Sequence, residues 1–200
     1  DAAPSLNGMP GLRRYRQWAH YIQGFDLVLS YNWGAMDGVM AHRLLAPFMK
    51  LPPLIHHEDG FNEDEAERLK SKRNLFRQVA LARATTLVVP SRTLEEVALG
   101  AWAQPARRIH RIANGIDVAA YAATSRADAI PGFVKREGEV VIGTLAGLRA
   151  VKNLPRLVRA VAPLGQAARL VIVGEGQERV AIHAQARALG IEDRVFLPGF

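Results

Sequence analysis

The sequence contains no cysteine. Disulfide bonds, thiolate nucleophiles and cysteine-ligated zinc are therefore excluded for this chain. Its apolar runs are far shorter than the roughly 20 residues that a membrane-spanning helix needs. The first residues, Asp1–Asn7, lack the basic and apolar regions of a signal peptide. We therefore expect a cytoplasmic protein.

The sequence also has no run of five or more basic residues, although the net charge is +7. A basic protein favours anionic partners, but a nucleic-acid binder typically shows a basic stripe with interleaved aromatic residues. We therefore expect no nucleic-acid partner. The segment Arg13–Trp18 is basic and aromatic. It is either an amphipathic helix packed on its own domain or a peripheral contact with the inner face of the membrane.

Short apolar runs alternate with longer amphipathic ones, which predicts an α/β fold. Most of the apolar runs are continuous stretches of Val, Ile and Leu, as in parallel strands that are buried on both faces. The expected strands are Asp26–Ser30, Pro53–His57, Thr86–Pro90, Ile109–Ala113, Val140–Leu145, Leu170–Gly174 and Arg194–Leu197.

Amphipathic segments between these runs predict helices and hence βαβ units in an open, doubly wound sheet. We expect Asn62 to cap one helix, Thr93 and Glu96 to form the capping box of another, and Gly190 to follow the end of a third. The expected helices are Gly11–Gln23, Ala35–Phe48, Asn62–Ala82, Thr93–Gly100, Leu154–Leu164 and Gln177–Leu189.

A segment with little periodicity separates two α/β regions. It runs from Asn114 to Glu139 and includes an Asn-Gly and a Pro-Gly turn signal. The predicted organisation is a first domain over residues 1–116, a linker over 117–138 and a second domain over 139–200. Both domains look incomplete. The first lacks a glycine-rich opening turn, and the second stops after its third strand.

Ligands of open α/β sheets bind at the carboxyl ends of the strands, so the loops there are the candidate sites. The loop after Val140–Leu145 carries Gly147, Arg149 and Lys152 and leads into a helix. Small residues, cations and a helix N-terminus together suit a diphosphate. The alternative is a solvated basic helix start.

The loop after Leu170–Gly174 contains Gly174, Glu175 and Gly176. A GxG turn permits a tight approach to a ligand, but glycine at such a turn often has a purely structural reason. The third glycine of the dinucleotide fingerprint is missing, so NAD binding is not supported.

Two loops of the first domain carry polar groups. His56, His57, Glu58 and Asp59 stand together at a strand end, where they could serve acid/base chemistry. Adjacent strand residues point to opposite faces, so the two histidines are not expected to share a metal. The loop after Asp26–Ser30 carries Asn32 and Trp33, which could hydrogen-bond and stack on a sugar, or pack under the next helix.

The order of these pieces resembles the GT-B glycosyltransferases of family 4, the retaining "glycosyl transferases group 1" type. The resemblance is carried by five phrases in the family's order. They are Ala84–Ser91, Arg111–Asp117, Gly143–Val161, Leu170–Arg179 and Leu189–Phe200.

The resemblance implies two Rossmann-like domains, with the acceptor bound mainly to the first and the nucleotide-sugar to the second. It implies that Lys152, assisted by Arg149, binds the donor diphosphate, and that Gly174 and Gly176 lie beside the nucleotide. His57, or His56, corresponds to the histidine near the transferred sugar. Gly147 stands where the family's motif has an arginine.

The function expected from this resemblance is retaining transfer of a sugar from a nucleotide-sugar to a saccharide or glycolipid acceptor in bacterial polysaccharide assembly. No metal or other cofactor is expected. The family's acidic E-x7-E motif is missing from these 200 residues, so we expect no useful transfer by this chain alone. A GT-B sugar-nucleotide epimerase and a non-catalytic nucleotide-sugar-binding module are the alternatives.

Overall fold

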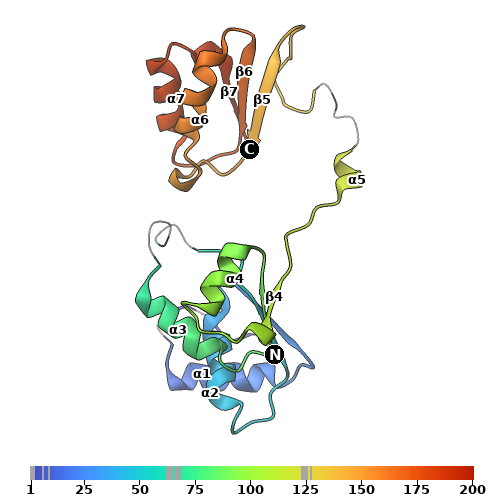
Figure 1. Ribbon diagram of the computed structural model, residues 1–200, viewed down its shortest axis with the longest axis vertical. Coiled ribbons are helices and arrows are strands. Elements are labelled where there is room, and N and C mark those ends of the chain that lie inside the picture. Colours follow the sequence, from blue (N-terminus) through green and yellow to red (C-terminus); the bar gives the residue numbers. More distant parts are fainter. Residues whose placement is uncertain are drawn as a thin grey trace. The chain divides into compact units, whose positions relative to one another are not determined.

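The computed structural model describes residues 3–5, 7, 8, 10–61, 65, 69–122, 126 and 128–200. The chain divides into two compact units, Asp1–Ile116 and Asp117–Phe200, and each contains one parallel sheet. In Figure 1 the first unit runs from blue to green and the second from yellow to red. The predicted α/β class is confirmed. The segment 117–138, which the sequence predicts as a linker, is grouped with the second unit.

Four parallel strands form the sheet of the first unit, in the sequential order β1-β2-β3-β4. Their carboxyl ends therefore lie along one edge of the sheet, where the intervening loops begin. The elements are α1 (Leu12–Ile22), β1 (Val28–Tyr31), η1 (Trp33–Ala35), α2 (Met36–Leu45), β2 (Leu54–His57), α3 (Ser71–Leu81), β3 (Thr86–Val89), α4 (Arg92–Leu99), η3 (Ala106–Arg108) and β4 (Ile109–Arg111).

One apolar core fills the space between this sheet and its helices. Leu54, Leu87 and Val89 contribute from the strands, and Trp102 is completely buried beside them. Helix α1 belongs to the same packing, because Tyr15 packs against the core and Arg14 pairs with Asp37 at 3.2 Å. No described helix is both long and apolar enough to cross a membrane.

The second unit has three parallel strands in the order β5-β6-β7. Helices α6 and α7 lie together on one side of this sheet (Figure 1), and Val158, Ile172 and Ile182 form part of the core between them. The elements are α5 (Val118–Tyr121), β5 (Val140–Leu145), η4 (Ala150–Lys152), α6 (Leu154–Val161), η5 (Ala162–Leu164), β6 (Ala168–Val173), α7 (Arg179–Ala188), η6 (Glu192–Arg194) and β7 (Val195–Gly199).

The segment before β5 is attached to this second sheet. Phe133 is buried against Phe196, with ring centroids 5.5 Å apart. The Arg169 guanidinium lies 4.5 Å from the Phe133 ring centroid and pairs with Glu139 at 3.2 Å. These contacts explain why part of the predicted linker is packed into the second unit.

The sequence predicts that most strands are buried on both faces of the sheet, and this prediction is wrong for β1 and β5. Leu29 is 72% exposed and Leu145 is 83% exposed. Right-handed crossovers between sequentially ordered parallel strands place their helices on one face of the sheet. Within the described ranges neither sheet shows the reversal of strand order that a doubly wound sheet requires.

The predicted helices Asn62–Ala82 and Thr93–Gly100 also differ from the structure. Helix α3 begins at Ser71, and the extended Lys70 before it donates its N–H to the Glu65 carboxylate at 3.1 Å. The predicted cap at Asn62 lies outside the described residues. Helix α4 is capped by Ser91, whose hydroxyl accepts the Leu94 N–H at 3.2 Å. Gly190 follows α7 with a φ of +65°, as predicted.

Candidate functional site

The two histidines at the end of β2 face opposite ways. His56 is completely buried; its Nδ1 lies 2.9 Å from the Ser30 hydroxyl and its Nε2 lies 3.5 Å from Glu58 Oε2. His57 has a side chain that is 35% exposed. Successive strand residues alternate between the two faces of a sheet, which explains this difference. The structure therefore places His57, and not His56, where a ligand can reach it.

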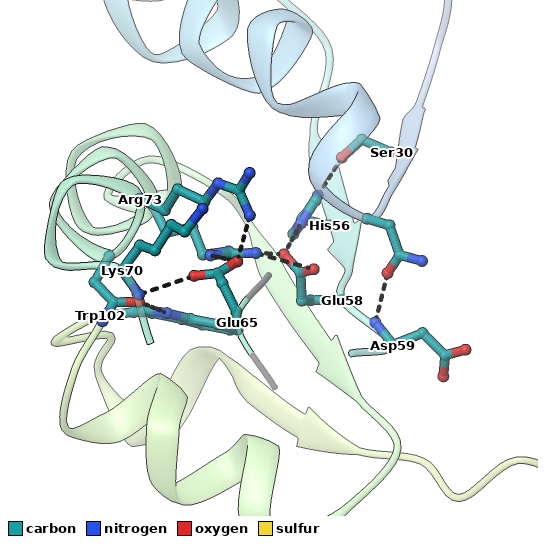
Figure 2. Close-up of polar contacts among 11 residues, drawn as sticks. Ser30, His56, Glu58, Asp59, Glu65, Lys70, Arg73 and Trp102 are labelled. Carbon is teal, nitrogen blue, oxygen red and sulfur yellow. Dashed lines mark hydrogen bonds and ion pairs between the residues drawn. The ribbon is translucent and has the colours of Figure 1, made fainter. Parts of the chain in front are cut away.

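Behind His56 lies a buried network of charged groups (Figure 2). Arg77 Nε donates to Glu58 Oε2 at 3.1 Å, and both side chains are shielded from solvent. Glu65 accepts from Arg73 at 2.9 Å and lies 3.7 Å from Arg77. Burial opposes ionisation of Glu65, but the hydrogen bonds from Arg73 and the Lys70 N–H, with the nearby Arg77 charge, hold its pKa below the ordinary value.

Aromatic rings surround the Arg77 guanidinium. It lies 4.8 Å from the Trp33 ring centroid and 5.1 Å from that of Trp102. Trp33 also packs edge-on against Phe76 and belongs to the periphery of the core. Trp33 and Glu58 are both predicted on the acceptor side, but both are engaged inside the unit. The Trp33 ring packs against side chains of α3, and the Glu58 carboxylate pairs with Arg77.

Asn32 and Asp59 lie at the surface of the same sheet edge, and Asp59 points away from the buried network (Figure 2). The Asp59 N–H donates to Asn32 Oδ1 at 2.6 Å. Asn32 has a φ of +54°, which is unusual for a residue other than glycine. Two hydrogen bonds hold Asn32 in this conformation: the one from the Asp59 N–H, and the one from its own N–H to the His57 carbonyl. A pocket of about 220 Å³ opens here, lined by Asn32, Trp33, Glu58, Asp59, Gly60 and Phe61.

The Asp59 carboxylate accepts hydrogen bonds from two other segments of the chain. It accepts from Tyr31 Oη at 3.0 Å and from Asn114 Nδ2 at 3.1 Å. The hydrogen bonds from Asn114 and then Tyr31 lower the pKa of Asp59, and the Asp59 hydrogen bond raises the pKa of Tyr31. Sequence reasoning treated Asn114 only as a turn residue, and its contact with Asp59 spans 55 positions.

In the second unit a pocket of about 320 Å³ lies at the carboxyl ends of the strands. Such strand ends are where open α/β sheets bind ligands. The pocket brings together three of the predicted site residues, Gly147, Gly174 and Glu175. Its full lining is Leu145, Ala146, Gly147, Val173, Gly174, Glu175 and Phe200.

Gly174 and Gly176 allow the two loops of this pocket to touch. A Cβ on Gly174 would lie 2.0 Å from the Ala146 carbonyl oxygen, and one on Gly176 would lie 2.4 Å from that of Leu148. Backbone hydrogen bonds join the loops, for example from Leu148 N–H to the Glu175 carbonyl at 2.9 Å. These glycines are required by the contact between the loops, which also shapes the pocket.

Of the two predicted phosphate-binding cations, Arg149 precedes the turn η4 and Lys152 is its last residue. Arg149 and Lys152 are exposed, and the Lys152 N–H donates to the Arg149 carbonyl at 2.9 Å. Within the described ranges neither cation pairs with a carboxylate. Glu175, in contrast, pairs with Arg179 at 3.1 Å, and Arg179 also donates to the Leu197 carbonyl at 2.8 Å.

Among the described residues, no three His, Asp or Glu side chains lie close enough together to hold a metal ion. The first unit offers polar hydrogen-bonding groups at the carboxyl end of its sheet. The second unit offers a pocket at the carboxyl ends of its strands and the exposed cations Arg149 and Lys152.

Comparison with known proteins relates part of the chain to a family. Residues 125–200 match the family model described as glycosyl transferases group 1. A GDP-mannose-dependent alpha-mannosyltransferase of Mycobacterium tuberculosis is 30% identical over 109 residues, which are 54% of this chain and 27% of that protein.

Solved structures share the fold over most of the chain. HepE of Anabaena, solved in complex with UDP, has a TM-score of 0.75 and 19% identity over 94% of this chain and 52% of its own. The lipopolysaccharide outer core galactosyltransferase WaaB has a TM-score of 0.59 and 16% identity over 94% of this chain and 49% of its own.

The chain thus spans about half the length of these solved proteins and about a quarter of the curated relative. The match over residues 125–200 covers nearly all of the second unit, and the fold likeness extends over both units. The chain is thus similar to these solved proteins in its α/β fold, and its residues 125–200 match the family model of the glycosyl transferases group 1.

Proposed function

We propose that this chain is part of a glycosyltransferase that moves a sugar from a nucleotide-sugar donor to a saccharide or glycolipid acceptor, with retention at the anomeric carbon. The observation that carries the proposal is the pocket of about 320 Å³ at the strand ends of the unit that matches the family model. HepE was solved with UDP and with UDP-glucose, and the mycobacterial relative is named for its dependence on GDP-mannose.

In this proposal the donor diphosphate binds at the turn between β5 and α6. Lys152 supplies a point charge, and Arg149 supplies a guanidinium that can make two parallel hydrogen bonds to phosphate oxygens. Both are exposed and have no described carboxylate partner, so no ion pair has to be broken for binding. Gly147, Gly174 and Glu175 line the adjacent pocket, which would take the nucleotide.

In the first unit we assign a role in the reaction to His57, and acceptor binding to Asn32 and Asp59. All three lie at one sheet edge, and Asn32 and Asp59 line the polar pocket there. Glu58 and Trp33 take a supporting role in this proposal because both are engaged with Arg77. No resident metal or cofactor is required, since the nucleotide-sugar is a substrate.

The proposal is tested by titrating UDP, GDP and ADP into the chain by calorimetry, with Lys152→Ala as the variant. Losing one charge-assisted phosphate contact should cost roughly 1.5–3 kcal/mol, which weakens binding by roughly 10- to 150-fold. Lys135→Ala is the matched control, because Lys135 is an exposed lysine of the same unit and does not line the pocket.

Binding of one nucleotide that weakens in Lys152→Ala and is unchanged in Lys135→Ala supports the assignment. Failure of all three nucleotides to bind, or equal affinities of the two variants, would overturn it. A second experiment distinguishes a glycosyltransferase from a non-catalytic binding module. If full-length protein binds the nucleotide-sugar but transfers no sugar to any acceptor, the non-catalytic alternative is favoured.

A further inference from the structure

The imidazole ring of His57 has one shielded nitrogen. Nε2 is out of contact with solvent and has no hydrogen-bond partner among the described residues. The side chain as a whole is 35% exposed, so the exposed part of the ring lies away from Nε2. A buried polar nitrogen without a partner costs free energy, so a nearby acceptor is expected to satisfy it.

The Asp59 carboxylate lies on that side, with Oδ1 4.0 Å from Nε2. Asp59 is itself held in place, because Tyr31 and Asn114 donate to its two oxygens and Asn32 accepts its N–H. An ionised carboxylate can accept about four hydrogen bonds. Two of these positions are used by Tyr31 and Asn114, so capacity for the His57 ring is left.

The other polar groups around the ring do not compete for Nε2. Glu58, which follows His57 in the chain, is committed to Arg77 and lies in the buried network. Tyr31 packs edge-on against the His57 ring, with centroids 5.2 Å apart, and its hydroxyl donates to Asp59. The acceptor that faces the shielded side of the ring is therefore Asp59.

We propose that Asp59 is a positioning residue for His57, whose carboxylate accepts the Nε2–H of the ring through a small movement of the Asp59 side chain. The partner of one ring nitrogen decides which nitrogen of a neutral histidine carries the proton. Asp59 thereby holds the proton on Nε2 and leaves Nδ1 as a hydrogen-bond acceptor. The role of His57 toward a sugar hydroxyl rests on the proposed function, but the Asp59–His57 contact does not.

The contact is tested by nuclear magnetic resonance of the ¹⁵N-labelled 200-residue chain at pH 8.5, about two units above the pKa of a free imidazole. The ring signals of His57 are those that disappear in His57→Gln. We expect a proton on Nε2 that exchanges slowly with water and resonates downfield, as in a hydrogen bond to a carboxylate. A proton on Nδ1, or no slowly exchanging proton on the His57 ring, overturns the proposal.

Variants of Asp59 then test the cause. In Asp59→Asn the Nε2 proton should move upfield or disappear through exchange, whereas Asp59→Glu should retain it because the longer carboxylate still reaches the ring. Asp128→Asn, the same change at an exposed site in the second unit, should leave the His57 signals unchanged. An unaltered Nε2 proton in Asp59→Asn overturns the proposal. If that variant does not fold, the wild-type and Asp59→Glu spectra decide. Nucleotide binding plays no part in these measurements, so their failure would leave the proposed function standing.

Discussion

Arg77 on α3 and Glu58 after β2 form an ion pair that is removed from solvent, with Nε 3.1 Å from Oε2. The two residues are 19 positions apart, so the pair ties a helix to the loop that follows the strand bearing His57. A buried pair of this kind is stabilising only while both partners are present, because a lone buried charge is strongly unfavourable. Loss of Arg77 should therefore both destabilise the first unit and disturb the loop after β2, next to His57.

Replacing Arg77 with methionine should destabilise the first unit by about 3–5 kcal/mol, because it leaves the buried Glu58 carboxylate uncompensated. The measurement is urea unfolding followed by tryptophan fluorescence. All three tryptophans, Trp18, Trp33 and Trp102, lie in the first unit, so the signal reports that unit alone. Arg83→Ala, an exposed arginine of the same unit, is the control. A loss of less than about 1 kcal/mol in the Arg77 variant would show that the pair is not buried as described.

Glu65 should make the stability of the same unit depend on acid. Its pKa is lower in the folded state than the ordinary value of about 4.3, so its stabilisation is complete above that pH and is lost as the pH falls through the folded-state pKa. Glu65→Gln should therefore be less stable than wild type near neutral pH, and the difference should shrink in acid.

The check on Glu65 is urea unfolding by tryptophan fluorescence between about pH 7 and pH 3. Glu96→Gln, at an exposed position of α4, should show no such convergence with wild type. A difference between Glu65→Gln and wild type that stays constant over this range would contradict the charge-based explanation.

Gly176→Ala should destabilise the second unit. The added Cβ would lie 2.4 Å from the Leu148 carbonyl oxygen, and the φ of +154° is unfavourable for alanine. Forcing atoms into such contact typically costs about 1–3 kcal/mol. Hydrogen exchange of the β6 backbone, followed by mass spectrometry, should be faster in the variant. Gly143→Ala is the control because an added Cβ there meets no atom within 4 Å. Equal exchange in the two variants would contradict the requirement for glycine at this turn.

Much of the fold could be predicted because the local sequence determines where many strands and helices lie. The run Val140–Leu145 coincides with β5, and Gly190 ends α7 as its backbone freedom suggests. The start of α4 was misplaced by a competing local pattern: Thr93 and Glu96 have capping-box spacing, but the hydroxyl of Ser91 caps the helix. Two residues of similar chemistry stand near one another there, and only the backbone path decides between them.

The candidate site was less predictable, because its contacts join distant segments. Periodicity indicated that His56 and His57 face opposite sides, but which one is buried depends on where Ser30 and Glu58 lie. Likewise, the hydrogen bond of Asn114 to Asp59 requires the chain after β4 to approach the end of β2, two strands away in the sheet. Strand order and register set these contacts, and neither is encoded locally.

Nucleotide binding at the carboxyl ends of β5 and β6 can be observed residue by residue, by adding UDP, and separately GDP, to the ¹⁵N-labelled chain and mapping the backbone signals that shift. We expect saturable shifts concentrated at Gly147, Lys152, Gly174 and Glu175, and no comparable cluster in the first unit. Saturable shifts that cluster elsewhere, or no shifts with either nucleotide, would contradict nucleotide binding at these strand ends.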